Sequence, residues 1–241
     1  MHILPPYLNV IIAYINFFSY KNMLKLVLGE IMKKGFLNVL LYLLFPGIFI
    51  SMFHNIMNSS FMYSLFTILP YMILCVYYII IYKKDFIYYL KNFKLKYIKW
   101  ILIIWIIGFI LMMLSNYIIN YKILPNNISG NEELNRTLLF NHKFTYTLLL
   151  SIIIPFLEEI SFRLEFKKNI KNKYVFLILT SLLFASMHLF TTTKVIELIY
   201  VIPYIILGFT FSFIYYKTDN VFSSIIAHII HNTLIVIMLL V

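Results

Sequence analysis

Long apolar runs, separated by short polar or basic stretches, set the pattern of the whole chain. Seven runs of 17 to 22 residues are bounded in this way: 36–53, 61–82, 100–119, 146–166, 174–190, 198–216 and 221–241. A helix of about twenty residues crosses roughly 30 Å of hydrocarbon. Because the runs lack the two-residue alternation of a membrane β-barrel, we predict an all-α fold, a polytopic transmembrane helical bundle.

An eighth apolar segment, residues 3–18, is interrupted by polar residues and prolines: Pro5, Pro6, Asn9 and Asn16. It lacks the basic start and the small-residue cleavage site of a signal peptide. The pattern leaves open whether this segment spans the membrane or lies at its surface, so we expect seven to eight spans.

Composition supports a membrane protein. Of 241 residues, 62% are hydrophobic and 12% are charged, and the mean hydropathy is +0.90. Soluble domains contain roughly 45–50% apolar residues, so a water-soluble globule is excluded. The single cysteine, Cys75, excludes an intramolecular disulfide.

The net charge of +11 comes from basic residues that lie mainly in the loops on one side of the expected spans. If seven spans alternate, 16 of the 20 basic residues lie on one side, and the other side receives Lys122, Arg136, Lys143 and Lys194. Basic loops face the cytoplasm, so the charge indicates topology in a lipid bilayer, and we expect no nucleic-acid partner. The wealth of Ile, Lys and Asn suggests A/T-rich codons, from which we expect a bacterial cytoplasmic membrane.

Two connections are long enough to have structure of their own. Segment 85–99 mixes aromatic residues with lysines, which predicts an amphipathic helix on the inner leaflet. Segment 120–144 is rich in Asn and Gly and predicts an exposed, irregular outer loop. We therefore divide the chain into N-terminal membrane spans (1–144), which include both connections, and a candidate catalytic core (145–241).

Ionisable residues, together with one amide, gather in three of the predicted spans. A charge near the middle of a bilayer costs about 2.5–3.5 kcal/mol on insertion scales, so such residues indicate function. The fourth span contains Glu158, Glu159 and Arg163; the fifth contains His188; the seventh contains His228, His231 and Asn232.

Helical spacing divides these residues into roles. Glu159 and Arg163 are four apart and can pair along one face, whereas Glu158 points about 100° away. His228 and Asn232 are also four apart, as are Phe184 and His188. A free carboxylate, imidazoles and a carboxamide that meet inside a bundle are suited to hydrolysis.

Three motifs stand in order on successive spans: E-E-x-x-x-R from residue 158, F-x-x-x-H from residue 184 and H-x-x-x-N from residue 228. In this respect the chain, over about 155–232, resembles the CPBP intramembrane proteases, the CAAX prenyl endopeptidase type II and bacteriocin-processing family. One departure is Leu164, where family members usually have glycine after the arginine.

The resemblance implies an intramembrane endopeptidase that cuts a membrane-associated peptide or protein. It implies that Glu158 and His188 activate water and that His228 and Asn232 hold the oxyanion of the tetrahedral intermediate. Structural roles would fall to Glu159, Arg163, Phe184 and His231.

The residues leave the metal question open. Glu158, His188 and His228 could ligate zinc with water in the fourth position. No H-E-x-x-H motif is present, and the favoured mechanism uses glutamate and requires no cofactor.

Two other functions remain compatible with the pattern: a noncatalytic immunity or scaffold protein of the same fold, and a small proton-linked transporter using Glu158. Any protease needs its site residues to converge. On straight helices His188, 14 residues beyond Tyr174, lies too far from Glu158. We therefore expect tilt, a kink at Pro155 or extension of the fourth helix through Asn169 to bring them together.

Overall fold

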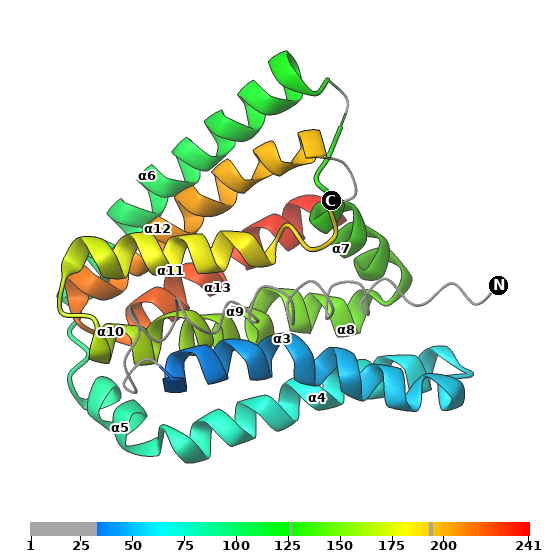
Figure 1. Ribbon diagram of the computed structural model, residues 1–241, viewed down its shortest axis with the longest axis horizontal. Helices are drawn as coiled ribbons and strands as arrows, with labels where there is room; N and C mark the ends of the chain where they lie inside the picture. The colour runs from blue at the N-terminus through cyan, green and yellow to red at the C-terminus, as the bar shows by residue number, and fades with distance from the viewer. Residues whose placement is uncertain (1–32, 126, 193–194) are drawn as a thin grey trace, which may run out of the picture.

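The protein is a bundle of antiparallel helices, seen here in a computed structural model that describes residues 33–125, 127–192 and 195–241 (Figure 1). No strand occurs within these residues. The all-α fold class is thereby confirmed. The uncertain segment 3–18 lies outside the described residues.

Five helical stretches of the described chain are long and apolar enough to cross a membrane. They are Lys33–Ile56, which includes α3 (Lys33–Phe53); α4 (Ser60–Ile81); Lys96–Ile123, which includes α6 (Lys96–Ile118); Val195–Thr218, which includes α12 (Val201–Thr218); and α13 (Val221–Leu240). These correspond to the predicted first, second, third, sixth and seventh spans.

The predicted fourth and fifth spans take a less regular form. The fourth is a continuous helical run, 143–169, built from α8 (Lys143–Leu148), a π-helical turn (Leu149–Ile153), α9 (Ile154–Glu159), a second π-helical turn (Ile160–Leu164) and α10 (Glu165–Asn169). The fifth is α11 (Lys173–Met187), an apolar helix of 15 residues. Both lie alongside the longer helices, with α9 between α3 and α13 (Figure 1).

The first part of segment 85–99 is helical, as predicted, but it packs on protein. Helix α5 (Lys83–Lys91) buries Phe86 and Tyr89. The Tyr89 hydroxyl lies 2.7 Å from the Tyr215 hydroxyl. Burial raises the pKa of Tyr89, so the hydroxyl stays neutral in this contact. The third span begins at Lys96, within the predicted segment.

The prediction of an irregular loop over 120–144 is wrong. Helix α7 (Gly130–Asn141) occupies its second half. The Ser129 side chain accepts a hydrogen bond from the Glu132 backbone N–H, and Arg136 pairs with Glu132 one turn later. A capped first turn with an i,i+4 ion pair stabilises a helix despite its polar composition.

Charge is segregated between the two ends of the bundle. Within the described residues, one end, which carries α5 and α10 in Figure 1, has 13 lysines: Lys33, Lys34, Lys83, Lys84, Lys91, Lys94, Lys96, Lys99, Lys167, Lys168, Lys171, Lys173 and Lys217. In the described part of the chain, the basic residues of the opposite end, which carries α7, are Lys122, Arg136 and Lys143. We call the two ends the basic end and the α7 end.

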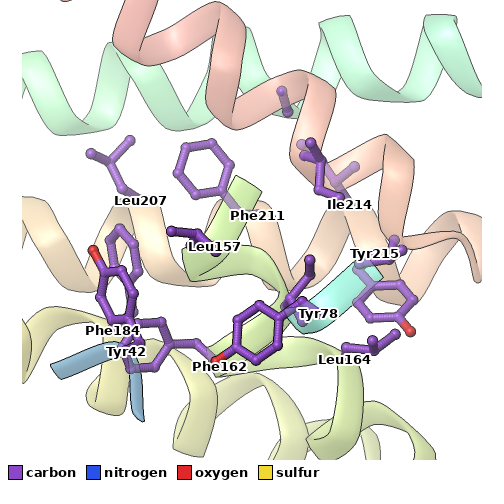
Figure 2. Packing of buried hydrophobic residues seen from close by; sticks show 14 of the residues in the cluster. Tyr42, Tyr78, Leu157, Phe162, Leu164, Phe184, Leu207, Phe211, Ile214 and Tyr215 are labelled. Carbon is purple, nitrogen blue, oxygen red and sulfur yellow. The ribbon is translucent and has the colours of Figure 1, made fainter. Parts of the chain in front are cut away.

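Aromatic rings interlock between the helices that position the site. Phe162, Phe184 and Phe211 lie fully buried on the 143–169 run, α11 and α12 (Figure 2). The Phe184 ring meets the other two edge-on, at centroid distances of 6.3 and 6.2 Å. Edge-to-face packing fixes ring orientation, so these helices are held in a defined register.

Candidate active site

A proline shapes the helix that carries the two glutamates. In the π-helical turn Leu149–Ile153, the Ile154 N–H bonds to Leu149 O, so the corresponding donor for Leu150 O would be residue 155. Pro155 has no N–H. The Leu150 carbonyl accepts instead from Asn232 Nδ2 on α13, at 2.9 Å. The predicted distortion at Pro155 is therefore a π-helical turn, and it fixes the Asn232 side chain.

Arg163 joins three helices from a fully buried position. Its Nη1 donates to Glu159 Oε1 at 2.6 Å, its Nε to Ser212 Oγ at 3.0 Å and its Nη2 to Gly208 O at 3.3 Å. Phe184 from α11 covers the guanidinium at 4.9 Å. A buried charge is tolerated only when it is paired and hydrogen-bonded, and this arginine meets that condition.

Glu158 points away from this pair, as the spacing predicts. Its side chain is buried, and its Oε1 accepts a hydrogen bond from the Tyr42 hydroxyl of α3 at 2.7 Å. The Tyr42 ring is itself held edge-on by Phe162. One carboxylate oxygen is thus fixed, and the other, Oε2, faces α13.

His228 lies between the two glutamates. Its Nδ1 is 2.8 Å from Glu159 Oε1, and its Nε2 is 3.6 Å from Glu158 Oε2. The ring stacks on Phe211 at 4.3 Å. Because Glu159 is paired with Arg163 and acts as an acceptor, the Nδ1 of His228 carries a proton, and Nε2 is the nitrogen available to a ligand.

His188 ends α11 with a comparable arrangement. Its Nδ1 is 2.9 Å from Phe184 O. A carbonyl oxygen can only accept, so Nδ1 donates and Nε2 is again the free nitrogen. The ring stacks on Tyr204 of α12 at 4.2 Å, which holds it in place.

The sequence-predicted catalytic residues line one pocket. The pocket has a volume of about 530 Å³, and Glu158, His188, His228 and Asn232 contribute to its wall, together with Tyr42. Extension of the fourth helix to Asn169 places Glu158 eleven residues from that helix end, roughly 16 Å along the axis. This extension accounts for much of the separation that straight spans would impose.

The residues predicted to be structural surround the catalytic candidates. Phe184 contacts both histidine rings, at 4.6 Å for His188 and 5.6 Å for His228. His231 is buried between Phe109 and Phe211, and within the described residues its Nδ1 has no hydrogen-bond partner. Leu164 is fully buried in the core and is not among the residues that line the pocket.

Sequence reasoning missed two polar contributors, Tyr42 and Ser212. Tyr42 is one of 20 tyrosines and stands in an apolar run, so no pattern marks it. Ser212 lies in a span without ionisable neighbours, and its Oγ bonds to Thr180 as well as to Arg163. Only packing between helices distinguishes them.

A three-ligand zinc site does not fit the side chains as they are arranged. Within the described residues no group of three His, Cys, Asp or Glu side chains is close enough to hold a metal ion. In addition, Tyr42 occupies Oε1 of Glu158. We derive no step through a metal, and the glutamate mechanism without a cofactor stays a prediction, with zinc as the alternative that experiment tests.

Comparison with known proteins agrees with these motifs. Residues 140–234 match the family model described as type II CAAX prenyl endopeptidase Rce1-like. The UPF0177 protein YxdF of Lactococcus lactis subsp. lactis (strain IL1403) is 30% identical over 148 residues, which cover 58% of this chain and 75% of that protein.

A second relative, named "Putative membrane peptidase YdiL", of Bacillus subtilis (strain 168), is 34% identical over 91 residues, 36% of this chain and 34% of its own length. No solved structure matches the chain. All four catalytic candidates fall inside the matched segment 140–234, whereas Tyr42 lies outside it. From the extent of the match to YxdF and the family model together, we conclude that this chain belongs to the Rce1-like family, described as type II CAAX prenyl endopeptidases.

Proposed function

We propose that the protein is an intramembrane endopeptidase in which Glu158 is the general base. One observation carries the proposal: the buried Glu158 carboxylate faces His228 at 3.6 Å, in a pocket that it shares with His188 and Asn232. A base, an imidazole and fixed hydrogen-bond donors around one space are the components of water-mediated acyl hydrolysis.

The Glu158 carboxylate would act through Oε2, because Oε1 accepts from Tyr42. Oε2 takes a proton from water as the water oxygen attacks the peptide carbonyl carbon, and a tetrahedral oxyanion forms. The carbon–nitrogen bond then breaks, and the proton passes from Glu158 to the departing amine. Such proton transfer typically contributes about 10²- to 10⁴-fold in rate.

The histidines and Asn232 would divide the remaining tasks. His188 accepts from the water through Nε2, since its Nδ1 is committed to Phe184 O. His228 donates to the oxyanion from Nε2 in its doubly protonated form, since Nδ1 faces Glu159. The second N–H of Asn232 Nδ2 is available to the oxyanion, because the first is bonded to Leu150 O. A fixed oxyanion donor is worth about 2.7–4 kcal/mol.

We place this activity in the cytoplasmic membrane of a bacterium, with a membrane-associated peptide or protein as substrate. The support comes from the apolar helices and from relatives that belong to two bacteria.

The test uses the full chain in liposomes with a library of quenched-fluorescent peptides anchored by an acyl chain. We expect cleavage by the wild type and none by Glu158→Gln or His228→Ala. Glu133→Gln, on the exposed face of α7, is the matched control and should cleave normally. Cleavage that persists in Glu158→Gln would contradict the role of Glu158 as general base, and absence of cleavage by the wild type would favour a noncatalytic protein or a transporter. A parallel assay with a chelator tests zinc dependence.

A further inference from the structure

Judged from the described residues that line it, the pocket extends from the catalytic candidates toward one end of the bundle. Its wall includes residues of the α7 end, among them Ser129, Glu132 and Arg136. The side chains of Glu132 and Arg136 are 40% and 41% exposed, so the wall of the pocket reaches solvent there. The mouth of the pocket is therefore at the α7 end.

Toward the basic end, the helix that carries Glu158 continues as tightly packed core. Phe162, Arg163, Leu164 and Phe166 are fully buried, and none of them lines the pocket. Phe166 also contacts α3, where a Cβ added at Gly35 would meet its ring at 3.0 Å. The described residues thus separate Glu158 from the basic end by a closed layer.

The charge distribution assigns the two ends to sides of the membrane. Thirteen described lysines lie at the basic end, against Lys122, Arg136 and Lys143 at the α7 end. Lysine-rich short loops stay in the cytoplasm. The α7 end, with the mouth of the pocket, therefore faces the outer side.

Amide side chains characterise the mouth. Asn120, Asn131 and Asn135 contribute to its wall. Among the described residues, Asn120 uses its Oδ1 to accept from Tyr200 and its NH₂ group has no partner, and the Asn135 side chain has no hydrogen-bond partner either. Glu132 and Arg136 neutralise each other, so the mouth carries little net charge.

An uncharged set of amides complements the backbone of an extended peptide, because each amide both donates and accepts. Met112, Met113 and Leu239 also line the pocket and supply apolar surface for side chains. Flexible methionines adapt to varied apolar groups.

We infer that the active-site pocket receives its substrate from the outer side of the membrane, as an extended, uncharged polypeptide segment whose backbone is held by Asn120 and Asn135. The inference rests on the proposed function for its chemistry, but the direction of entry and the binding contacts follow from the pocket and the charges alone.

The first experiment determines the side. In a Cys75→Ser background, Asn135→Cys at the mouth and Lys94→Cys at the basic end are expressed in bacterial cells and treated with a membrane-impermeant maleimide. We expect labelling of Asn135→Cys in intact cells and of Lys94→Cys only after permeabilisation. The reverse pattern would overturn the inference, whether or not the protein cleaves peptides.

The second experiment measures binding without catalysis. In the Glu158→Gln, Cys75→Ser protein in liposomes, an environment-sensitive fluorophore is attached at Glu133→Cys, beside Glu132 on α7, or at Lys94→Cys, and the acyl-anchored peptide library is added without its quencher. We expect a change in emission only for the fluorophore at position 133. An unchanged signal there, or the same change at both positions, would refute entry at the mouth. Because cleavage is not required, this failure is distinct from failure of the proposed function.

Discussion

Hydrogen bonds from outside the recognised motifs set the orientation of the motif residues. Tyr42 holds one oxygen of Glu158, and Ser212 holds Nε of Arg163. Each contact joins a different helix to the 143–169 run. The site is therefore built from side chains whose positions depend on the packing of α3 and α12 as much as on the glutamate-bearing helix.

Removing the Tyr42 hydroxyl is expected to impair turnover more than binding. Tyr42→Phe keeps the ring against Phe162 but frees Oε1 of Glu158. Loss of a hydrogen bond to a charged group that positions a base should lower kcat about 10- to 100-fold, with little change in KM. Cleavage of the anchored peptides measures both. Tyr77→Phe, at an exposed tyrosine of α4, is the control, and an equal loss there would argue against the positioning role.

Replacing Arg163 is expected to act mainly by lowering the stability of the protein, not by removing a group that takes part in catalysis. Arg163→Ala leaves the buried Glu159 carboxylate without its cation and should lower the free energy of unfolding by about 3–5 kcal/mol. Thermal unfolding in detergent measures the effect. The exposed pair offers the comparison, since Arg136→Ala should cost less than about 1 kcal/mol. Similar losses of unfolding free energy at both positions would show that the buried ion pair stabilises the protein no more than the exposed one.

Among the elements, α11 and α12 approach each other most closely where a glycine permits it. A Cβ added at Gly208 would lie 2.9 Å from the Cα and 3.0 Å from the O of Ser181. The carbonyl oxygen of Gly208 also accepts a hydrogen bond from Arg163. The packing of this helix pair and the anchoring of the arginine are therefore coupled at one position.

Gly208→Ala is expected to separate the two helices. Because the obstructing atoms belong to backbone, the cost should be about 1–3 kcal/mol in unfolding free energy, with reduced peptide cleavage. Gly47→Ala in α3, where an added Cβ meets nothing within 4 Å, should be neutral or slightly stabilising. Detergent unfolding compares the two, and a neutral Gly208→Ala would contradict the close approach.

At the scale of the whole molecule, the N-terminal spans cover the face that bears Glu158. Helix α3 packs along the second π-helical turn, and α4 contacts α9. The division into 1–144 and 145–241 stays a prediction about sequence organisation, but these contacts imply that the second part needs the first in order to fold.

The fragment 145–241 is accordingly expected to misfold when it is expressed alone in membranes, because Glu158 would lose Tyr42 and the core at Phe166 would be exposed to lipid. Co-expression with 1–144 should restore resistance to limited proteolysis. A fragment that resists proteolysis and cleaves peptides by itself would show that 145–241 is autonomous.

The whole chain also shows where sequence patterns suffice. Long apolar runs report lipid contact directly, so the helical membrane fold followed from hydropathy. The i,i+4 spacing of Glu159 and Arg163 predicted an ion pair within one helix, and the structure contains it. The capping signature Ser129-x-x-Glu132 also predicts α7, but the polar composition around it obscured that signal.

Hydropathy and residue spacing predict the membrane-embedded helical fold, the order of the motifs and the residues too polar for lipid. Tertiary structure alone decided that Tyr42 meets Glu158, that Asn232 satisfies the carbonyl beside Pro155 and that the pocket opens at the α7 end. The physical reason is that hydropathy indicates which residues contact lipid, and helical spacing indicates which residues are neighbours within one helix. They carry no information about which helix faces come together, because that depends on side-chain packing between segments far apart in the chain.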